Sequence, residues 1–250
     1  MTEKEKPELF VHGKRLDGRT VEDLRPLKIQ AGVLNSADGS AFVQWGNNKV
    51  LAGVYGPREC IPKHDSDPYK AVLKCRYNMA PFCSSGEHSR SGPSRRSTEL
   101  SKVIREVFEG LILTDKYPKT MIEIYIEVLQ SDGGTRCAAV TAAAVALADA
   151  GIPMRDMVAA VASGKIQEHI VADLGKDEDN YGQSDFPVAV SWRDKEILLF
   201  QMDGLLTRQQ FEHALNLSIS TVEKVKVLQK EALLRSFEEK NGSPRVNLNL

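Results

Sequence analysis

The stretch that organises the chain is Gln130–Ala150, QSDGGTRCAAVTAAAVALADA. Two adjacent glycines, Gly133 and Gly134, allow the backbone to approach a ligand closely. The first free N–H groups of the helix that follows carry partial positive charge. Thr135 adds a hydroxyl and Arg136 adds a guanidinium that matches the shape of a phosphate or carboxylate. The sequence therefore predicts an anion site; the alternative is an ordinary strand-to-helix turn with a solvated Arg136.

The segments on either side of the glycines have opposite patterns. The preceding residues 121–130, MIEIYIEVLQ, alternate as a strand does. The following residues are apolar on nearly all sides of a helix, which indicates a helix buried in the core. An anion site at the start of a buried helix would be held rigidly.

The composition is that of a globular protein with no overall basic charge. The chain has 250 residues and a formal net charge of −1, so any binding of nucleic acid depends on a local basic patch. The four cysteines show no CxxC pair and no histidines at zinc spacing, which is typical of a reducing compartment. No signal peptide opens the chain, and no apolar run reaches the ~20 residues that span a bilayer. We expect a soluble cytoplasmic protein without a membrane partner.

The first third of the chain predicts an antiparallel meander. Its strand segments are residues 27–33, 40–45, 49–56 and 71–79, and hairpin-type turn signals separate the first three. Farther along, strands are expected at 121–130, 157–165, 169–173, 185–192 and 196–202, with a long helix at 207–239.

This order predicts an α+β fold in which mixed sheets pack on helices. Strands followed by a helix occur twice, which indicates two pseudo-repeated βα halves without a linker between them. We therefore expect a polar N-terminal arm at residues 1–14, a single domain at 15–240 and a C-terminal tail at 241–250.

A second cationic feature lies at the start of another helix. Residues 83–97 resemble a loop, and apolar residues at helical spacing follow from Leu100 to Leu111. Pro93 and Ser94 are start signals, which places Arg95 and Arg96 in the first turn. The helix dipole disfavours cations there by roughly 0.3–1 kcal/mol. The two arginines therefore indicate a nearby anion, unless both simply extend into solvent.

The acidic segment 173–185, DLGKDEDNYGQSD, is the third chemical feature. Tyr181 and Gly182 favour a turn that brings the carboxylates of Asp179 and Asp185 together. The pair could hold Mg²⁺ with waters and substrate phosphates, or one carboxyl could supply a proton to a leaving oxygen. The alternative is a solvated acidic turn, and that is the expectation for Asp173, Asp177 and Glu178.

Together these features predict a reaction between two anions. Arg96, Gly134, Thr135 and Arg136 would bind a free anion, while Asp179 and Asp185 with Mg²⁺ would act on a polymeric phosphate. A cationic cradle and a metal overcome the repulsion between two such reactants. This combination favours phosphorolysis.

Five motifs carry a resemblance to a known family. GNNKVLAGVYGPRE (46–59), YNMAPF (77–82), SRRSTELSKVIREV (94–107), QSDGGTRCAAVTAA (130–143) and DEDNYGQSDFPVAV (177–190) resemble the ribonuclease PH family, and the resemblance covers residues 15–238. GKRLDGR (13–19) and the meander are closer to the catalytic, ribonuclease-PH-like subunit of the archaeal exosome than to the free-standing bacterial enzyme.

The resemblance implies a fold and an activity. The fold is that of ribonuclease PH, which is like domain 2 of ribosomal protein S5. The activity is a phosphate-dependent 3′→5′ exoribonuclease that releases nucleoside diphosphates, runs backwards as a polymerase, and uses Mg²⁺ or Mn²⁺ with inorganic phosphate as co-substrate. By motif match, Arg96, Gly134, Thr135 and Arg136 would bind phosphate, and Asp179 and Asp185 would be catalytic or metal-binding.

The resemblance also implies partners. Six such folds would form a ring around a channel for single-stranded RNA. Three copies of this chain would alternate with three copies of a non-catalytic paralogue, as a trimer of heterodimers, with cap proteins of the S1 or KH type. Arg58, Lys63 and His64, in a loop between early strands, and Arg95 would contact the RNA backbone. Tyr77 and Phe82 are candidates for base stacking, although core packing is the expected role of each.

Two alternatives remain open. A free-standing ribonuclease PH trimming transfer-RNA 3′ ends would be a homohexamer that is active alone. A non-catalytic ring subunit that only binds RNA would be expected to lack an arginine or carboxylate that this chain retains at Arg96, Arg136 and Asp179.

Overall fold

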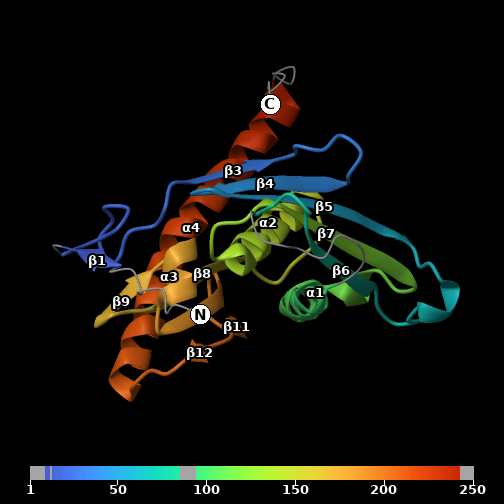
Figure 1. Cartoon of the computed structure of the whole chain (residues 1–250). Helices are drawn as coiled ribbons and strands as arrows, with labels where there is room; N and C mark the ends of the chain where they lie inside the picture. The colour runs from blue at the N-terminus through green and yellow to red at the C-terminus, as the bar shows by residue number, and fades with distance from the viewer. Residues whose placement is uncertain (1–8, 12, 85–93, 243–250) are drawn as a thin grey trace.

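The computed structural model describes residues 9–11, 13–84 and 94–242. The expected helix-start residue Pro93, most of the expected polar arm and residues 243–250 of the expected tail lie outside these ranges. The expected arm ends in a small hairpin, in which β1 (Phe10–Val11) pairs with β2 (Lys14–Arg15). Figure 1 shows the course of the chain.

The first sheet contains five strands in the order β3-β4-β5-β7-β6. They are β3 (Leu27–Ala31), β4 (Gly39–Trp45), β5 (Asn48–Glu59), β6 (Val72–Met79) and β7 (Thr120–Gln130). Strands β3, β4 and β5 form the predicted antiparallel meander, which confirms three of its four expected strands.

The fourth expected strand of the meander is placed differently. β6 does not pair with β5; it runs parallel to β7, which lies between them. Parallel neighbours need a long crossover, and helix α1 (Arg95–Glu109) supplies it between β6 and β7. The predicted antiparallel pairing of this strand was therefore wrong, because the strand's own residues do not specify its partner.

The second sheet carries the C-terminal half of the chain. Its order is β11-β10-β8-β9, with β12 pairing to β10. The strands are β8 (Val158–Ile166), β9 (His169–Ala172), β10 (Ser184–Ser191), β11 (Ile197–Phe200) and β12 (Asp203–Gly204). Helix α3 (Lys176–Tyr181) connects β9 to β10.

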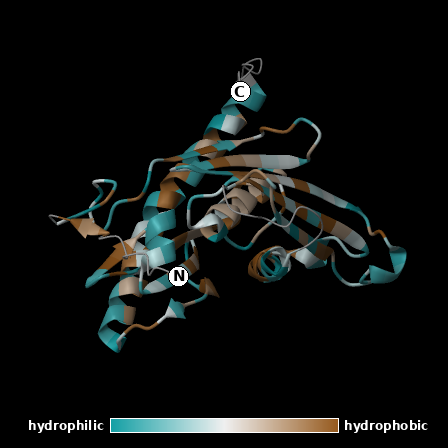
Figure 2. Ribbon diagram, in the orientation of Figure 1, coloured by the Kyte–Doolittle hydropathy of each residue, from teal (hydrophilic) through white to brown (hydrophobic). Residues whose placement is uncertain are grey.

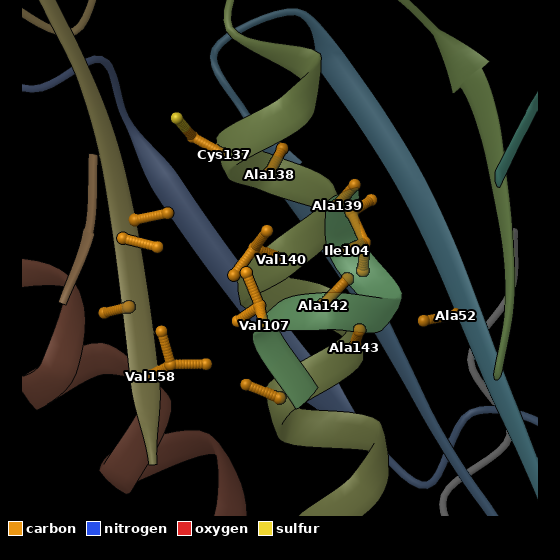
Figure 3. Close-up of a cluster of buried hydrophobic side chains, with 14 of the residues drawn as sticks. Ala52, Ile104, Val107, Cys137, Ala138, Ala139, Val140, Ala142, Ala143 and Val158 are labelled. Carbon is orange, nitrogen blue, oxygen red and sulfur yellow. The ribbon is translucent and has the colours of Figure 1, made fainter. Parts of the chain in front are cut away.

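Helix α2 (Thr135–Asp149) lies at the centre of the molecule. It contacts β4 and β5 of the first sheet and β8 of the second, and all residues from Cys137 to Leu147 are buried. Small side chains such as Ala138 and Ala142 let both sheets approach it closely, as Figure 3 shows. In Figure 2 the helix is largely apolar along its length. The predicted all-round burial is confirmed, and it fixes the start of α2 firmly in space.

Helix α4 (Arg208–Gly242) is the long C-terminal helix that the sequence predicted. It packs on β3, β8 and β9 and so touches both sheets (Figure 1). Short 3-10 helices lie at Lys63–Asp65 and Thr114–Lys116. Each half of the chain thus presents a sheet followed by a long helix, which confirms the α+β prediction. Within the described residues, no helix has both the length and the hydropathy of a membrane span.

Candidate active site

The two glycines form the strand-to-helix turn that the sequence predicted. Both have positive φ, 72° at Gly133 and 68° at Gly134, a region that favours glycine. Asn48 on β5 fixes the turn: its Oδ1 accepts from Asp132 N at 2.6 Å, and its Nδ2 donates to Gly133 O at 2.5 Å. The free N–H groups at the start of α2 are therefore held in one fixed direction, from which they can bind an anion. Residues Asp132–Gly134 are called the glycine turn below.

Arg96 and Thr135 bring the starts of two helices together. Arg96 lies in the first turn of α1, and its Nη2 is 3.5 Å from the Oγ1 of Thr135, the first residue of α2. The hydroxyl of buried Tyr77 on β6 donates to the same oxygen at 3.1 Å. Ser94 caps α1 in a capping box with Ser97, which confirms the predicted helix start and holds Arg96 in place.

Arg136 follows Thr135 and is half-buried. Its Nε is buried and has no hydrogen-bond partner in the described part of the chain. A buried guanidinium N–H without a partner is costly, and an anion bound from outside would satisfy it.

Asp179 and Asp185 lie within electrostatic reach of these arginines. Burial raises the pKa of Asp185 to about 6, with a further rise from the charge of Asp179, and Arg136 opposes both. Asp179 is exposed on α3, yet partial desolvation of its carboxylate raises the pKa of Asp179 against the attraction of Arg96 and Arg136. The chain thus brings the two predicted arginines and the two predicted carboxylates together.

The connection between the carboxylates differs from the prediction. Tyr181 ends helix α3 and is not part of a simple turn, so Asp179 lies on a helix while Asp185 lies on β10. Glu178 explains the helix, because its carboxylate accepts from Gly175 N at 2.7 Å and caps the first turn.

Asp203 is a carboxylate that the sequence did not single out. It pairs with Asp185 across the β10–β12 ladder, and its charge contributes to the raised pKa of both Asp179 and Asp185. The only sequence signal was the segment QMDG at 201–204, which resembles an ordinary turn. Strand pairing, which sequence pattern alone does not give, places it at the site.

The carboxylates fit a hard divalent cation. Burial raises the pKa of Asp185 most, and the charge of Asp179 raises it further, so a cation between the two carboxylates would favour their ionised forms. Mg²⁺ is commonly held by one or two carboxylates together with waters and substrate phosphates. In the described residues, no three His, Cys, Asp or Glu side chains gather closely enough to enclose a metal. This donor set fits Mg²⁺ or Mn²⁺ shared with a phosphate better than a closed structural site.

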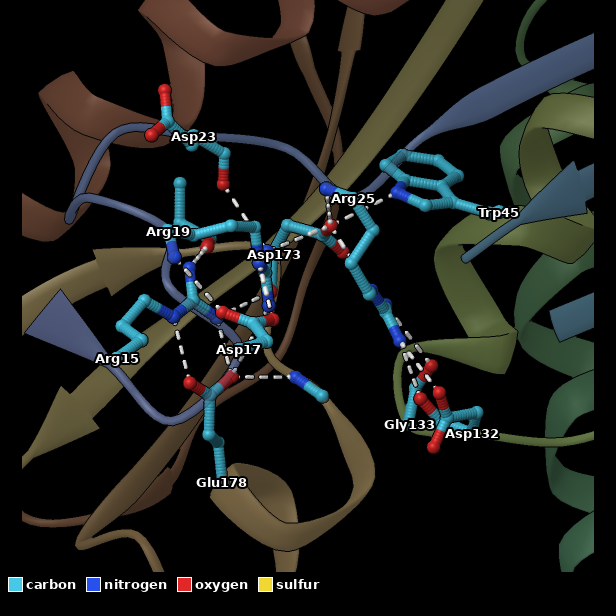
Figure 4. Close-up of polar contacts among 12 residues, drawn as sticks. Arg15, Asp17, Arg19, Asp23, Arg25, Trp45, Asp132, Gly133, Asp173 and Glu178 are labelled. Atoms are coloured by element: carbon cyan, nitrogen blue, oxygen red, sulfur yellow. Dashed lines mark hydrogen bonds and ion pairs between the residues drawn. The ribbon is translucent and has the colours of Figure 1, made fainter. Parts of the chain in front are cut away.

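Two of the residues expected in a solvated acidic turn are buried. Asp173 is 3% exposed and Glu178 is 6% exposed, whereas Asp177 is exposed as expected. Asp173 pairs with Arg25, and Glu178 pairs with Arg15, as Figure 4 shows. The prediction was wrong for Asp173 and Glu178 because their arginine partners come from a distant part of the sequence.

The candidate RNA contacts lie in different surroundings. Arg58 is on β5 itself, not in the loop, where it pairs with Glu123 and lies 5.3 Å from the ring centre of Tyr55. Lys63 and His64 are exposed on the 3-10 helix, with Glu59 and Asp65 as their partners. Arg95 is exposed beside Arg96 at the start of α1 and so lies nearest to the site.

The two aromatic candidates for base stacking, Tyr77 and Phe82, differ in burial. Tyr77 is 1% exposed and belongs to the core, as expected. Phe82 is 73% exposed, so the expected core role is wrong for this residue. It follows β6 in a segment that ends at the limit of the described residues, and its ring faces solvent there.

The chain matches two models of one protein family and several curated relatives. The family model described as 3′ exoribonuclease family, domain 1, matches residues 23–153, and that of domain 2 matches residues 156–221. The chain is 55% identical to the exosome complex component Rrp41 of Thermococcus onnurineus over 90% of both chains. It is 51% identical to the Rrp41 component of Pyrococcus abyssi, over 96% of this chain and 99% of that protein.

Solved structures agree with these matches. A chain of the Archaeoglobus fulgidus exosome with RNA bound to the active site superimposes with a TM-score of 0.74 at 25% identity, over 86% of this chain and 92% of that one. Rice Rrp46 superimposes with a TM-score of 0.79 at 22% identity, over 88% of this chain and 100% of that one. This match shows the shared fold. With family models covering most of its length and relatives above 50% identity, the chain belongs to the ribonuclease PH family of 3′ exoribonucleases.

Proposed function

We propose that the chain is the phosphorolytic 3′→5′ exoribonuclease subunit of an exosome ring, in the cytoplasm. One observation carries the proposal. Arg96, Thr135 and Arg136, at the starts of α1 and α2, converge with Asp179 of α3 and Asp185 of β10. A cationic seat beside a carboxylate pair suits a free phosphate that attacks a phosphodiester.

Phosphorolysis uses the two parts of the site for different tasks. An oxygen of inorganic phosphate forms a bond to the phosphorus of the terminal phosphodiester, and the bond from that phosphorus to the neighbouring 3′ oxygen breaks. The products are a nucleoside diphosphate and an RNA shortened by one nucleotide, and the reverse reaction lengthens the RNA. Arg96, the Thr135 hydroxyl and Arg136 hold the attacking phosphate, together with the N–H groups that follow Gly134.

The carboxylates serve the leaving side of the reaction. The departing 3′ oxygen needs a proton, and a carboxyl with a raised pKa such as Asp179 or Asp185 can supply one. Alternatively, the two carboxylates in their ionised form would hold Mg²⁺ or Mn²⁺, which when bound would neutralise charge on the reacting phosphates.

Partners are proposed on the relatives' names and on the surface of the chain. The relatives are exosome components, so we assign this chain to a hexameric ring with a non-catalytic ribonuclease-PH-like paralogue and S1- or KH-type cap proteins. Arg95 beside the site, with Lys63, His64 and the paired Arg58, would contact the phosphates of single-stranded RNA.

The experiment compares the purified chain alone and with its paralogue on unstructured RNA, with phosphate and Mg²⁺. We expect nucleoside diphosphates only when phosphate is present, and only when the partner is present. Full activity of the chain alone as a homohexamer would favour the free-standing ribonuclease PH. RNA binding without turnover in either case would favour the non-catalytic ring subunit.

A further inference from the structure

A buried ionic cluster adjoins the proposed phosphate seat, which consists of Arg96, Thr135 and Arg136. The cluster is not part of that seat. It joins three segments distant in sequence: residues 15–25, the glycine turn, and the stretch from Asp173 to Glu178 (Figure 4). Arg15, Arg25, Asp173 and Glu178 are all at most 7% exposed. So much buried charge is costly unless each group is paired and oriented, which these groups are.

Arg25 connects Asp173 to the glycine turn. Its Nη2 donates to Asp173 Oδ1 at 2.7 Å and its Nε donates to Oδ2 at 3.0 Å. The Nη1 of Arg25 donates to Asp132 O, and its Nη2 also donates to Gly133 O at 3.3 Å. One planar group therefore fixes two consecutive carbonyls immediately before the helix that carries Thr135 and Arg136.

Asp173 is held in an unusual backbone conformation by the same contacts. Its φ is 56°, in the left-handed region that few residues other than glycine adopt. Its carboxylate also accepts from Arg25 N at 2.6 Å and from Trp45 Nε1 at 3.0 Å. These bonds fix where the chain turns from β9 towards α3.

Arg15 extends the cluster to the helix that carries Asp179. Its Nε donates to Glu178 Oε1 at 2.6 Å, and its two other nitrogens donate to Ala172 O at 2.6 Å and Asp173 O at 2.7 Å. Glu178 is the neighbour of Asp179 and caps α3 through Gly175 N. The orientation of α3 therefore depends on the same cluster.

The glycine turn and α3 also touch directly. A side-chain carbon on Gly133 would lie 2.7 Å from the backbone carbon of Gly175 and 2.8 Å from Lys176 N. The start of α3 thus packs on the turn with no room for a side chain. A displacement of either segment must move the other.

We infer that the Arg25–Asp173 ion pair is a positioning element that sets the phosphate seat against the helix carrying Asp179. Arg25 is a positioning residue, since it is bonded to the backbone of the turn and has its hydrogen-bonding groups directed at protein atoms. This inference rests on the proposed function for its link to phosphate. A misplacement of about 1 Å can cost roughly 100-fold in rate, so small shifts should be measurable.

The variants are Arg25→Lys and Asp173→Asn in the full chain, assembled with the paralogue where activity requires it. Lysine keeps the charge but cannot bond Asp173 and two carbonyls at once. Asparagine keeps the size and tolerates positive φ while removing the charge. Three measurements are made: the KM for phosphate, the KM for RNA, and hydrogen exchange of residues 131–137 and 175–182.

We expect Arg25→Lys to raise the KM for phosphate about tenfold or more while the KM for RNA changes less than about twofold. Hydrogen exchange should accelerate in both segments together. The controls are Arg208→Lys, an arginine on α4 whose side chain is 91% exposed, and Val225→Ala, a buried α4 position in the main hydrophobic core. Val225→Ala should lower Tm without changing the KM for phosphate.

Three results would overturn the inference. The first is a folded Arg25→Lys variant in which both the KM for phosphate and hydrogen exchange are unchanged, and the second is a variant in which the KM for phosphate and the KM for RNA rise equally. The third is a rise in the KM for phosphate in Val225→Ala as large as that in Arg25→Lys, when the two variants have lost the same amount of Tm. If Asp173→Asn does not fold, Arg25→Lys decides the question. If the wild-type chain cleaves RNA without phosphate, the proposed function fails, while the exchange measurement still tests whether the two segments move together.

Discussion

The Nη2 of Arg96 lies 3.5 Å from the Oγ1 of Thr135, although 39 positions separate the two residues in the sequence. The contact joins the first turn of α1 to the first residue of α2, so two helix N-termini face the same position. Both ends carry partial positive charge, and Arg96 and Arg136 add full charges. An anion at this position would be stabilised from several directions at once.

Arg136→Ala should weaken the use of phosphate far more than the binding of RNA. A hydrogen bond to a charged group is worth about 1.5–3 kcal/mol, so kcat/KM for phosphate should fall roughly 10- to 100-fold. Steady-state kinetics at varied phosphate would measure it, with Arg208→Ala as the solvated control. An Arg136→Ala variant with normal kinetics would mean that the seat lies elsewhere.

Asp179→Asn should abolish turnover and leave RNA retention nearly intact. The substitution keeps the size of the side chain but removes the charge and the acidic proton, whichever of the two the reaction uses. Single-turnover cleavage and filter binding would separate the effects. Asp177→Asn is the matched control on the same helix, since Asp177 is exposed. Equal losses in both variants would implicate the stability of α3 instead of the chemistry of Asp179.

Asp185 should make the stability of the fold dependent on pH. Burial and the charge of Asp179 raise its pKa from 3.8 to about 6, so the folded chain holds this proton more tightly than the unfolded chain does. The stability that this group contributes is therefore fully present below about pH 4 and is lost as the pH rises through about 6.

Asp185→Asn should consequently be more stable than the wild type at about pH 7.5, by at most about 3 kcal/mol, because each pKa unit corresponds to about 1.4 kcal/mol. The difference should shrink as the pH falls towards about 4. Denaturant titrations of the assembled protein at several pH values would measure it, with exposed Asp194→Asn as control. A constant difference at all pH values would contradict the raised pKa.

Phe82→Ala should leave stability within about 0.5 kcal/mol of the wild type, because the ring is 73% exposed. Phe108→Ala, at a fully buried position on α1, should cost about 3–5 kcal/mol. Thermal denaturation of the two variants would check the contrast. Equal destabilisation would mean that the ring of Phe82 is covered in solution.

Local features of this fold were predictable from the sequence. The glycine turn, the buried helix α2 and the Ser94 cap depend on residues a few positions apart, so pattern and propensity suffice to identify them. Residues Arg96, Thr135 and Arg136 were found for the same reason, since each lies at a helix start.

Long-range pairing was not predictable in the same way. The parallel partner of β6, the approach of Asp203 to Asp185, and the burial of Asp173 and Glu178 all depend on contacts between distant segments. A carboxylate in a polar stretch has the same sequence pattern whether it is solvated or paired with an arginine more than 140 positions away, as Asp173 is with Arg25. Only the fold distinguishes the two cases.

The most direct test of phosphorolysis follows the attacking phosphate into the product. Unlabelled, unstructured RNA is incubated with the assembled protein, Mg²⁺ and radiolabelled inorganic phosphate, and the released nucleotides are separated. We expect the label to appear in the terminal phosphate of nucleoside diphosphates and release to stop when phosphate is omitted. Release of unlabelled nucleoside monophosphates at the same rate without phosphate would contradict it.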